Sequence, residues 1–576
     1  MISFSRVDCL FVLSQLVSLV TAACYYQSPA FPPPEYRKPC PELLEAFGQI
    51  EASLSTLMVD PALNTSSYSI EVTSSRSTLW SRFHTARDKD SERPGADQVD
   101  GRSAYRIASI TKTFTVLGLL QQHAAGNLSL DDTIDTYISS LKRPQTGTIP
   151  WKDVTLRSLA SQLSGIPRDW AQGDLLTEFP DPSQIGLPPV PSSGLPECGP
   201  FNNYVPCTAE ELLQNLRTKP PLFAPNQKST YSNIAYELLG LVLTNVTGMS
   251  YEDYIDTAIL KPLNMTGTSF SKPADSVAVL PKNHHWYWDV DEGVQNPTGG
   301  LYASSSDMSK FLRYILTHYN GITHALNWLH PASFTSGINS FYGIPWEILR
   351  TNKILGGPDR AVTFVTKSGG LPAYRTIIIL VPEYELGITI LTAGDETFLE
   401  QIREIVTVPV IQAADKIAKR QVQDAYTGTF GAENINSSIT LSYTEKQGLE
   451  ISRWISNGTD VLGAIPIQFQ MGTANFHLQV VPTLLFRDPA NLNGELWRTA
   501  VTPERPEPKH AAVWDDLCLS DLDTMMYAGK PLNEIAFWDR DHRGKYGKVE
   551  LTAFRVSMTR QAHEDLLADK LVMQDL

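Results

Sequence analysis

Tyr105-Arg-Ile-Ala-Ser109-Ile-Thr-Lys112-Thr-Phe-Thr-Val-Leu-Gly-Leu-Leu120 is an apolar segment with a serine and a lysine at its head. Its apolar side chains recur at helical spacing, at Ile110, Phe114, Leu117 and Leu120. Since Val116 and Leu119 fill the other side, we expect a buried helix. Residues three apart lie on one helix face, so Ser109 and Lys112 should point the same way. A helix N-terminus favours developing negative charge, which suits a nucleophile on the first turn.

Ser-x-x-Lys alone is a weak signal, because it also occurs at Ser139/Lys142 and Ser269/Lys272. Two further motifs follow Ser109, namely Tyr231-Ser-Asn233 and Lys367-Ser-Gly369, and neither pattern occurs elsewhere in the chain. Read singly, the first would be a helix N-cap and the second a solvated strand end. The three motifs together, in this order, favour a catalytic site.

These motifs resemble the active site of serine β-lactamases and penicillin-binding proteins, in the class C variant that carries tyrosine in the second motif. The segments 107–114, 128–132, 159–167 and 297–303 share the resemblance, which covers roughly residues 40–420, and a fungal-type β-rich domain follows. The resemblance implies the catalytic residues Ser109, Lys112, Tyr231, Asn233 and Lys367. It also implies an oxyanion hole from the N–H groups of Ser109 and Gly370, and substrate contacts from Ser368 and Gly369.

The physical chemistry of these residues fits a nucleophilic serine. Serine needs a base within hydrogen-bond reach. For Tyr231 to serve, its pKa must fall from about 10 to about 7, which corresponds to about 4 kcal/mol. One ammonium group about 4 Å away supplies roughly that at an effective dielectric constant near 20. Lys112 and Lys367 could therefore hold Tyr231 as a phenolate, or either lysine could itself be the base.

The third motif departs from the family's usual pattern, which more often has threonine or histidine where this chain reads Lys367-Ser368-Gly369-Gly370. We expect the second glycine to enlarge the site and to remove a side chain that could bind a β-lactam carboxylate. This argues against antibiotic hydrolysis and leaves ester or amide chemistry.

Strand and helix patterns predict an α+β fold of the β-lactamase/transpeptidase type. Strands within 68–84 and 362–392 should form one antiparallel sheet with helices 41–57 and 398–420 against it, and 110–330 should form a mostly helical lobe. The site should lie between the sheet and this lobe. We expect a signal peptide at 1–23, a hydrolase domain at 24–424, a polar linker at 416–423, and a β-rich domain at 425–576, for which a small barrel is the candidate architecture.

Several features favour secretion. Arg6 precedes an apolar core and small residues at 21–23, which is typical of a cleaved signal peptide. Cys198 and Cys207 lie close enough in sequence to form a disulfide, while the pairing of Cys24, Cys40 and Cys518 stays open. Six sequons could carry glycans: Asn64, Asn127, Asn245, Asn264, Asn436 and Asn457. The net charge of −15 argues against nucleic acid or anionic membranes as partners.

The sequence therefore predicts a secreted serine hydrolase that acts on a small-molecule or peptide substrate through an acyl-Ser109 intermediate, without a cofactor. The alternatives are an acyltransferase, transesterase or D-amino-acid peptidase of secondary metabolism, and a non-catalytic binding protein that kept the fold. His284 and His285 lack the spacing of a metal site, so no metal is expected. The neighbouring tryptophans and tyrosine, Trp286, Tyr287 and Trp288, could line an acyl pocket. Substrate and oligomeric state stay open.

Overall fold

The computed structural model describes residues 31–37, 40–142, 147–170, 175–178, 181–191, 196, 198–199, 205–323, 326–355, 360–432, 434–445, 447–468, 475–503, 517, 522 and 525–562. The expected signal peptide, Cys24 and Cys518 lie outside these residues. Contacts divide the chain into two compact units. One comprises Leu43–Thr351 with Val362–Val410, and the other Met1–Glu42, Asn352–Ala361 and Ile411–Leu576.

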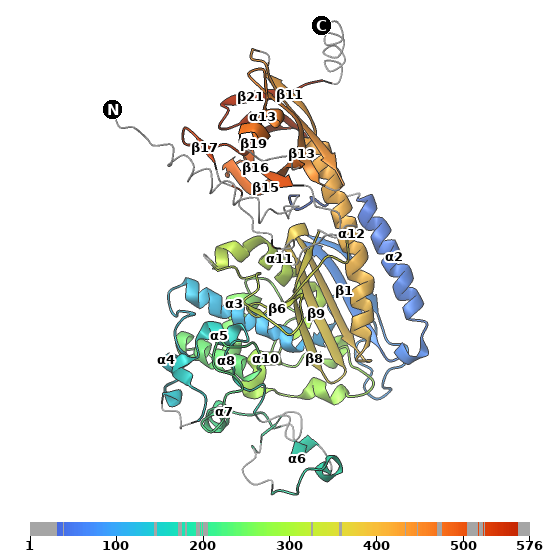
Figure 1. Cartoon of the computed structure of the whole chain (residues 1–576). Helices are drawn as coiled ribbons and strands as arrows, with labels where there is room; N and C mark the ends of the chain where they lie inside the picture. The colour runs from blue at the N-terminus through green and yellow to red at the C-terminus, as the bar shows by residue number, and fades with distance from the viewer. Residues whose placement is uncertain are drawn as a thin grey trace, which may run out of the picture. The chain divides into compact units, whose positions relative to one another are not determined.

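The first unit is built on an eight-stranded antiparallel sheet in the order β2-β1-β10-β9-β8-β7-β6-β5 (Figure 1). The strands are β1 Ser67–Ser74, β2 Thr78–His84, β5 Ser333–Phe334, β6 Ser340–Tyr342, β7 Glu347–Thr351, β8 Val362–Leu371, β9 Tyr374–Val381 and β10 Leu386–Ala393. The predicted pairing of 68–84 with 362–392 is confirmed. The three strands β5, β6 and β7 were not predicted, because their sequences are short and not clearly alternating.

Strand β1 is buried on both faces, although its sequence alternates apolar and polar residues. Tyr68 contacts Phe398 at the start of helix α12 (Phe398–Tyr426), with ring centroids 6.0 Å apart. On the neighbouring strand, Trp80 stacks on Phe47 of helix α2 (Pro41–Leu57) at 5.2 Å. On the other face, Glu71 accepts hydrogen bonds from serines at the start of helix α11 (Ser305–Thr323). A second layer of helices therefore covers the polar face that alternation alone would assign to solvent.

The helical lobe is built around α3 (Thr111–Ala124), the predicted apolar helix, whose residues Thr111 to Leu120 are all buried. It ends before Gly126, which has φ +75° as a residue past a helix C-terminus often does. Around it lie α4 Ile134–Tyr137, α5 Leu156–Ala160, α7 Ala209–Leu216, α8 Ile234–Thr247, α9 Tyr251–Ile255 and α10 Asn296–Gly299, with α6 Leu175–Glu178 in the long proline-rich segment. A two-stranded ribbon, β3 (Ala104–Arg106) with β4 (Tyr302–Ser304), leads into α3.

The second unit contains the predicted β-rich domain. Its strands are β11 Gly428–Ala432, β12 Ser437–Thr444, β13 Gly448–Ser456, β14 Thr459–Asp460, β15 Phe476–Asp488, β16 Asn493–Pro503, β19 Glu534–Arg540, β20 Tyr546–Leu551 and β21 Val556–Arg560. The pairing of β12 with β13 joins the two ends of the strand order and closes a barrel, with β14 added at β13. Helix α13 (Val461–Gln468) and the small β17–β18 hairpin (Met526–Tyr527, Lys530–Pro531) complete the described part.

The predicted polar linker at 416–423 is wrong, because α12 continues as a helix to Tyr426. Within this span Ile417, Ala418 and Val422 are buried on one side of the helix. The lysines, arginine and glutamines that suggested a linker lie between these apolar positions. A helix with a narrow apolar stripe reads as polar when only its composition is considered.

Surface features that bear on secretion are partly visible. Cys198 and Cys207 form a disulfide, as predicted, and Cys40 is buried. Asn127, Asn245, Asn264, Asn436 and Asn457 are exposed and Asn64 is partly exposed, so each sequon asparagine lies at the surface. Among the described residues, no helix is both long and apolar enough to cross a membrane.

Candidate active site

Ser109 lies on a single 3-10 turn, Ala108–Ile110, between β3 and α3. The turn is sharp: Ala108 has φ +51°, a left-handed conformation that costs energy for any residue but glycine and that is common at functional sites. Arg106, buried directly before the turn, donates to the carbonyl oxygens of Gly300 and Val290. This anchored ribbon fixes where the Ser109 hydroxyl points.

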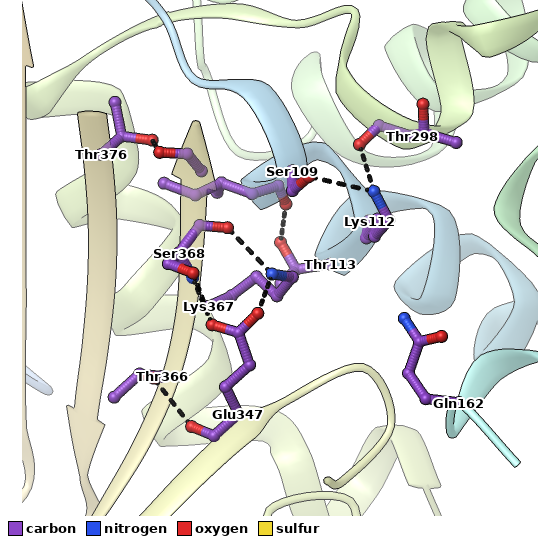
Figure 2. Close-up of polar contacts among 12 residues, drawn as sticks. Ser109, Lys112, Thr113, Gln162, Thr298, Glu347, Thr366, Lys367, Ser368 and Thr376 are labelled. Carbon is purple, nitrogen blue, oxygen red and sulfur yellow. Dashed lines mark hydrogen bonds and ion pairs between the residues drawn. The ribbon is translucent and has the colours of Figure 1, made fainter. Parts of the chain in front are cut away.

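Lys112 lies one turn further along and reaches back to Ser109. Its Nζ donates to Ser109 Oγ at 3.1 Å and to the Thr298 carbonyl oxygen at 2.9 Å (Figure 2). It also donates to Asn233 Oδ1 at 2.9 Å. These three acceptors match the three N–H donors of an ammonium group. All three acceptors are neutral, so the buried lysine is fixed in direction without a carboxylate partner.

Asn233 and the motif around it are held in place by the loop that follows α5. Its Nδ2 donates to Asp169 Oδ1 at 2.7 Å, and its backbone N–H donates to the Arg168 carbonyl oxygen at 2.8 Å. Ser232 N–H donates to Gln162 Oε1 at 2.7 Å. Sequence reasoning missed Asp169 and Gln162 as partners, although 159–167 belonged to the resemblance. The loop thus locks the second motif into one conformation.

Tyr231 is surrounded by positive charge. Lys112 Nζ lies 5.2 Å from its ring centroid, Lys367 Nζ 5.3 Å and Arg168 Cζ 4.8 Å. Burial raises the pKa of Tyr231, but the positive charges of Lys112 and Lys367 lower it by more, so the net pKa lies below the ordinary value of 10.0. A contact with Ser109 lowers this pKa further. The two lysines therefore favour the ionised form of this tyrosine.

Lys367 makes contacts of a different kind from those of Lys112. Its Nζ forms an ion pair with Glu347 Oε1 and donates to the Ser368 carbonyl oxygen at 2.9 Å (Figure 2). Glu347 Oε2 also accepts from the Ser368 N–H at 3.0 Å and the Ser368 hydroxyl at 2.6 Å. No sequence motif pointed to Glu347. Strand pairing brings it here, because Glu347 of β7 lies opposite Thr366 of β8.

The pKa values of the two lysines move in opposite directions. Burial lowers the pKa of Lys112, and the oxygen of Tyr231 only partly offsets this. Burial lowers the pKa of Lys367 as well, but the negative charges of Glu347 and Tyr231 raise it by more, to a net value above the ordinary one. The surroundings of Lys367 therefore favour its charged form, whereas burial disfavours the charged form of Lys112.

Gly369 and Gly370 place β8 against the nucleophile turn. A Cβ at Gly369 would lie 2.2 Å from the Ile107 carbonyl oxygen, so glycine is needed for this close approach. N–H groups alternate along a strand, so the Gly370 N–H points to the same side as the Ser368 N–H, towards the site. The expectation that Gly370 enlarges the site is wrong. A Cβ there would meet the Arg375 guanidinium at 3.0 Å, which already fills the space.

The other sequence candidates lie apart from this cluster. Trp288 is buried against Tyr302 and Tyr374, so it belongs to the core and does not line an acyl pocket. Of the two other Ser-x-x-Lys matches, Ser139 is exposed and Lys272 pairs with Asp289. No group of three or more metal-ligating side chains occurs in the described part of the chain.

The chain is similar in sequence to a known family of proteins. A family model described as Beta-lactamase matches residues 58–407. The chain belongs to the β-lactamase family. A second model, described as Beta-lactamase-like-like, C-terminal domain, matches residues 418–562. The β-lactamase-family relatives include "Probable hydrolase M10" of a Phoma species, 34% identical over 94% of this chain and 92% of its own length. "Probable hydrolase clz13" of Cochliobolus lunatus is 34% identical over 93% of this chain and 91% of its own length.

A solved structure titled "A class C beta-lactamase" is also similar to the chain. It is 18% identical, covers 66% of this chain and 98% of its own, and superposes with a TM-score of 0.47.

Replacing Tyr231 with phenylalanine tests the acid–base role of its hydroxyl. We expect the rate at which a fluorophosphonate labels Ser109 to fall by roughly 10²- to 10⁴-fold, the usual range for loss of a general base. The matched control is Tyr236→Phe. Its ring also lies 5.2 Å from Lys112 Nζ, but its hydroxyl donates to the Ala160 carbonyl oxygen. That variant should lose about 1 kcal/mol of stability and label normally. Equal loss of labelling in both variants would contradict the role.

Proposed function

We propose that this member of the β-lactamase family is a serine hydrolase that cleaves an ester or amide through an acyl-Ser109 intermediate. The observation that carries the proposal is the contact of Lys112 Nζ with Ser109 Oγ at 3.1 Å, beside Tyr231. The charges of Lys112 and Lys367 lower the pKa of Tyr231 by more than burial raises it. A weak nucleophile, its base and the groups that tune that base are all present.

In the first step, Ser109 Oγ attacks the substrate carbonyl carbon and its proton passes to Tyr231 or Lys112. The N–H groups of Ser109 and Gly370 are the proposed donors to the oxyanion, which would gain most of its stabilisation from such fixed dipoles. The tetrahedral intermediate then collapses, its C–O or C–N bond breaks, and the alkoxide or amine leaving group takes the proton from that base. Water attacks the acyl-enzyme carbonyl and gives a proton to the same base, which passes it to Ser109 Oγ as the acyl–Ser109 bond breaks.

Two features of the third motif support an ester or simple amide over a β-lactam as the substrate. The Ser368 hydroxyl donates to Glu347 Oε2 at 2.6 Å and is not turned towards a substrate carboxylate. Next to it, Gly370 offers no side chain for such a contact. The names of the two fungal relatives, both probable hydrolases, support water as the acyl acceptor. Acyl transfer to an alcohol would use the same intermediate.

We also propose that the protein is secreted and glycosylated. The apolar N-terminal stretch, the surface asparagines of the six sequons and the Cys198–Cys207 disulfide support this proposal. Expression in a fungal host should yield extracellular protein that begins near residue 24 and loses mass on treatment with an N-glycosidase. Retention in the cytosol with an intact N-terminus would refute it.

Replacing Ser109 with alanine tests the covalent intermediate. We expect a normally folded protein that forms no adduct with a fluorophosphonate and hydrolyses no member of an ester and D-amino-acid peptide panel. The matched controls are Ser139→Ala and Ser269→Ala, which alter the two other Ser-x-x-Lys matches and should retain full labelling and turnover. Intact mass and peptide mapping identify the modified residue. Adduct formation at another serine, or turnover that survives Ser109→Ala, would overturn the proposal.

A further inference from the structure

One carboxylate outside the three motifs, that of Glu347, binds two residues of the third motif, Lys367 and Ser368. Glu347 lies on β7, and it receives the Lys367 ammonium group and both donors of Ser368 (Figure 2). The Lys367 side chain is only 1% exposed, whereas that of Glu347 is 28% exposed. A buried ammonium group that is paired in this way is fixed both in position and in charge.

The two lysines lie at nearly the same distance from the ring of Tyr231, but they have different hydrogen-bond and ion-pair partners. Their Nζ atoms lie 5.2 and 5.3 Å from the ring centroid. Lys112 donates to a hydroxyl, an amide and a carbonyl oxygen, whereas Lys367 is bound to a carboxylate. A neighbouring carboxylate favours the charged form of a lysine, and neutral acceptors favour it far less.

We propose that Glu347 is a positioning residue that holds Lys367 as an ammonium ion beside Tyr231. The Ser109 proton then passes to Tyr231, while Lys367 keeps its own proton throughout the cycle. The inference rests on the proposed function, because it concerns how Ser109 is activated. No bond to the substrate is made by Glu347, which acts only through Lys367 and Ser368.

The charged and titratable groups around Lys367 determine how activity should depend on pH. These groups are Glu347 from β7, Tyr342 from β6, Tyr231 ahead of α8 and Lys112 from α3, with Arg168 on the ring of Tyr231. Activation of Ser109 needs Tyr231 ionised and Lys367 protonated. In a plot of labelling rate against pH, the ionisation of Tyr231 therefore sets the acid limb and the deprotonation of Lys367 sets the alkaline limb. The charge of Glu347 raises the pKa of both groups. Its loss should therefore move both limbs to lower pH.

The experiment measures the rate of Ser109 labelling by a fluorophosphonate across the pH range, in the full-length protein and its variants. In Glu347→Gln we expect both limbs at lower pH, with the alkaline limb displaced by at least about one pH unit, so that labelling on that limb falls about tenfold. Glu347→Asp keeps the charge and should return the alkaline limb towards that of the natural protein, at a lower maximum rate.

The matched control is Glu383→Gln. Glu383 Oε2 accepts the Thr363 N–H at 3.1 Å, so it binds the backbone of the same strand β8 but not Lys367. Neither limb of the pH–rate profile should move in Glu383→Gln. A purely structural role for Glu347 would lower the rate equally at every pH, and that result would overturn the proposal.

Folding of each variant is checked by circular dichroism. If Glu347→Gln does not fold, Glu347→Ser takes its place, because it removes the same negative charge with a smaller side chain. It should move both limbs of the pH–rate profile in the same direction, and unmoved limbs would again overturn the proposal. If the natural protein shows no labelling of Ser109 at any pH, the proposed function fails, and the role of Glu347 fails with it. Labelling with identical limbs in Glu347→Gln removes the role of Glu347 alone.

Discussion

Two buried ammonium groups flank a single tyrosine ring, and the arrangement of the site depends on keeping them there. Bringing like charges together away from water is unfavourable unless each has its own compensation. Lys367 is compensated by the carboxylate of Glu347, and Lys112 by three neutral oxygens. The remaining imbalance acts on Tyr231, whose burial raises its pKa while the two lysines lower it by more. The positive charge of both lysines thus acts on the tyrosine beside Ser109.

The fold supplies this arrangement from two sides. Helix α3 and the turn before it carry Ser109 and Lys112, while strands β7 and β8 carry Glu347 and Lys367. Gly369 lets β8 lie against the Ile107 carbonyl oxygen, so the two parts meet without a side chain between them. The sheet and the helical lobe therefore lie in close contact at the site. A small displacement of either would separate the serine from the groups that activate it.

Local sequence was enough to predict the nucleophile helix, the central strands and the five motif residues that the structure brings together. Helical spacing fixes Ser109 relative to Lys112, and β-branched runs identify β8 to β10. Glu347 could not be predicted, because only strand pairing brings it to Lys367, 20 residues further along the chain. The environment of Gly370 was misjudged for a similar reason, since Arg375 reaches it across the β8–β9 pair. The end of α12 was missed because its apolar stripe is narrow.

The ionisation of Tyr231 is the most direct test of this electrostatic arrangement. Carbon-13 labelling at Cζ of all tyrosines would let NMR follow each ring during a pH titration, and a Tyr231→Phe spectrum would assign the signal. We expect one tyrosine to ionise below the ordinary pKa of 10.0, and its signal to be missing from the variant. If every tyrosine of the folded protein ionised at or above that value, the lysine pair would not be tuning a base, and the activation of Ser109 described here would be wrong.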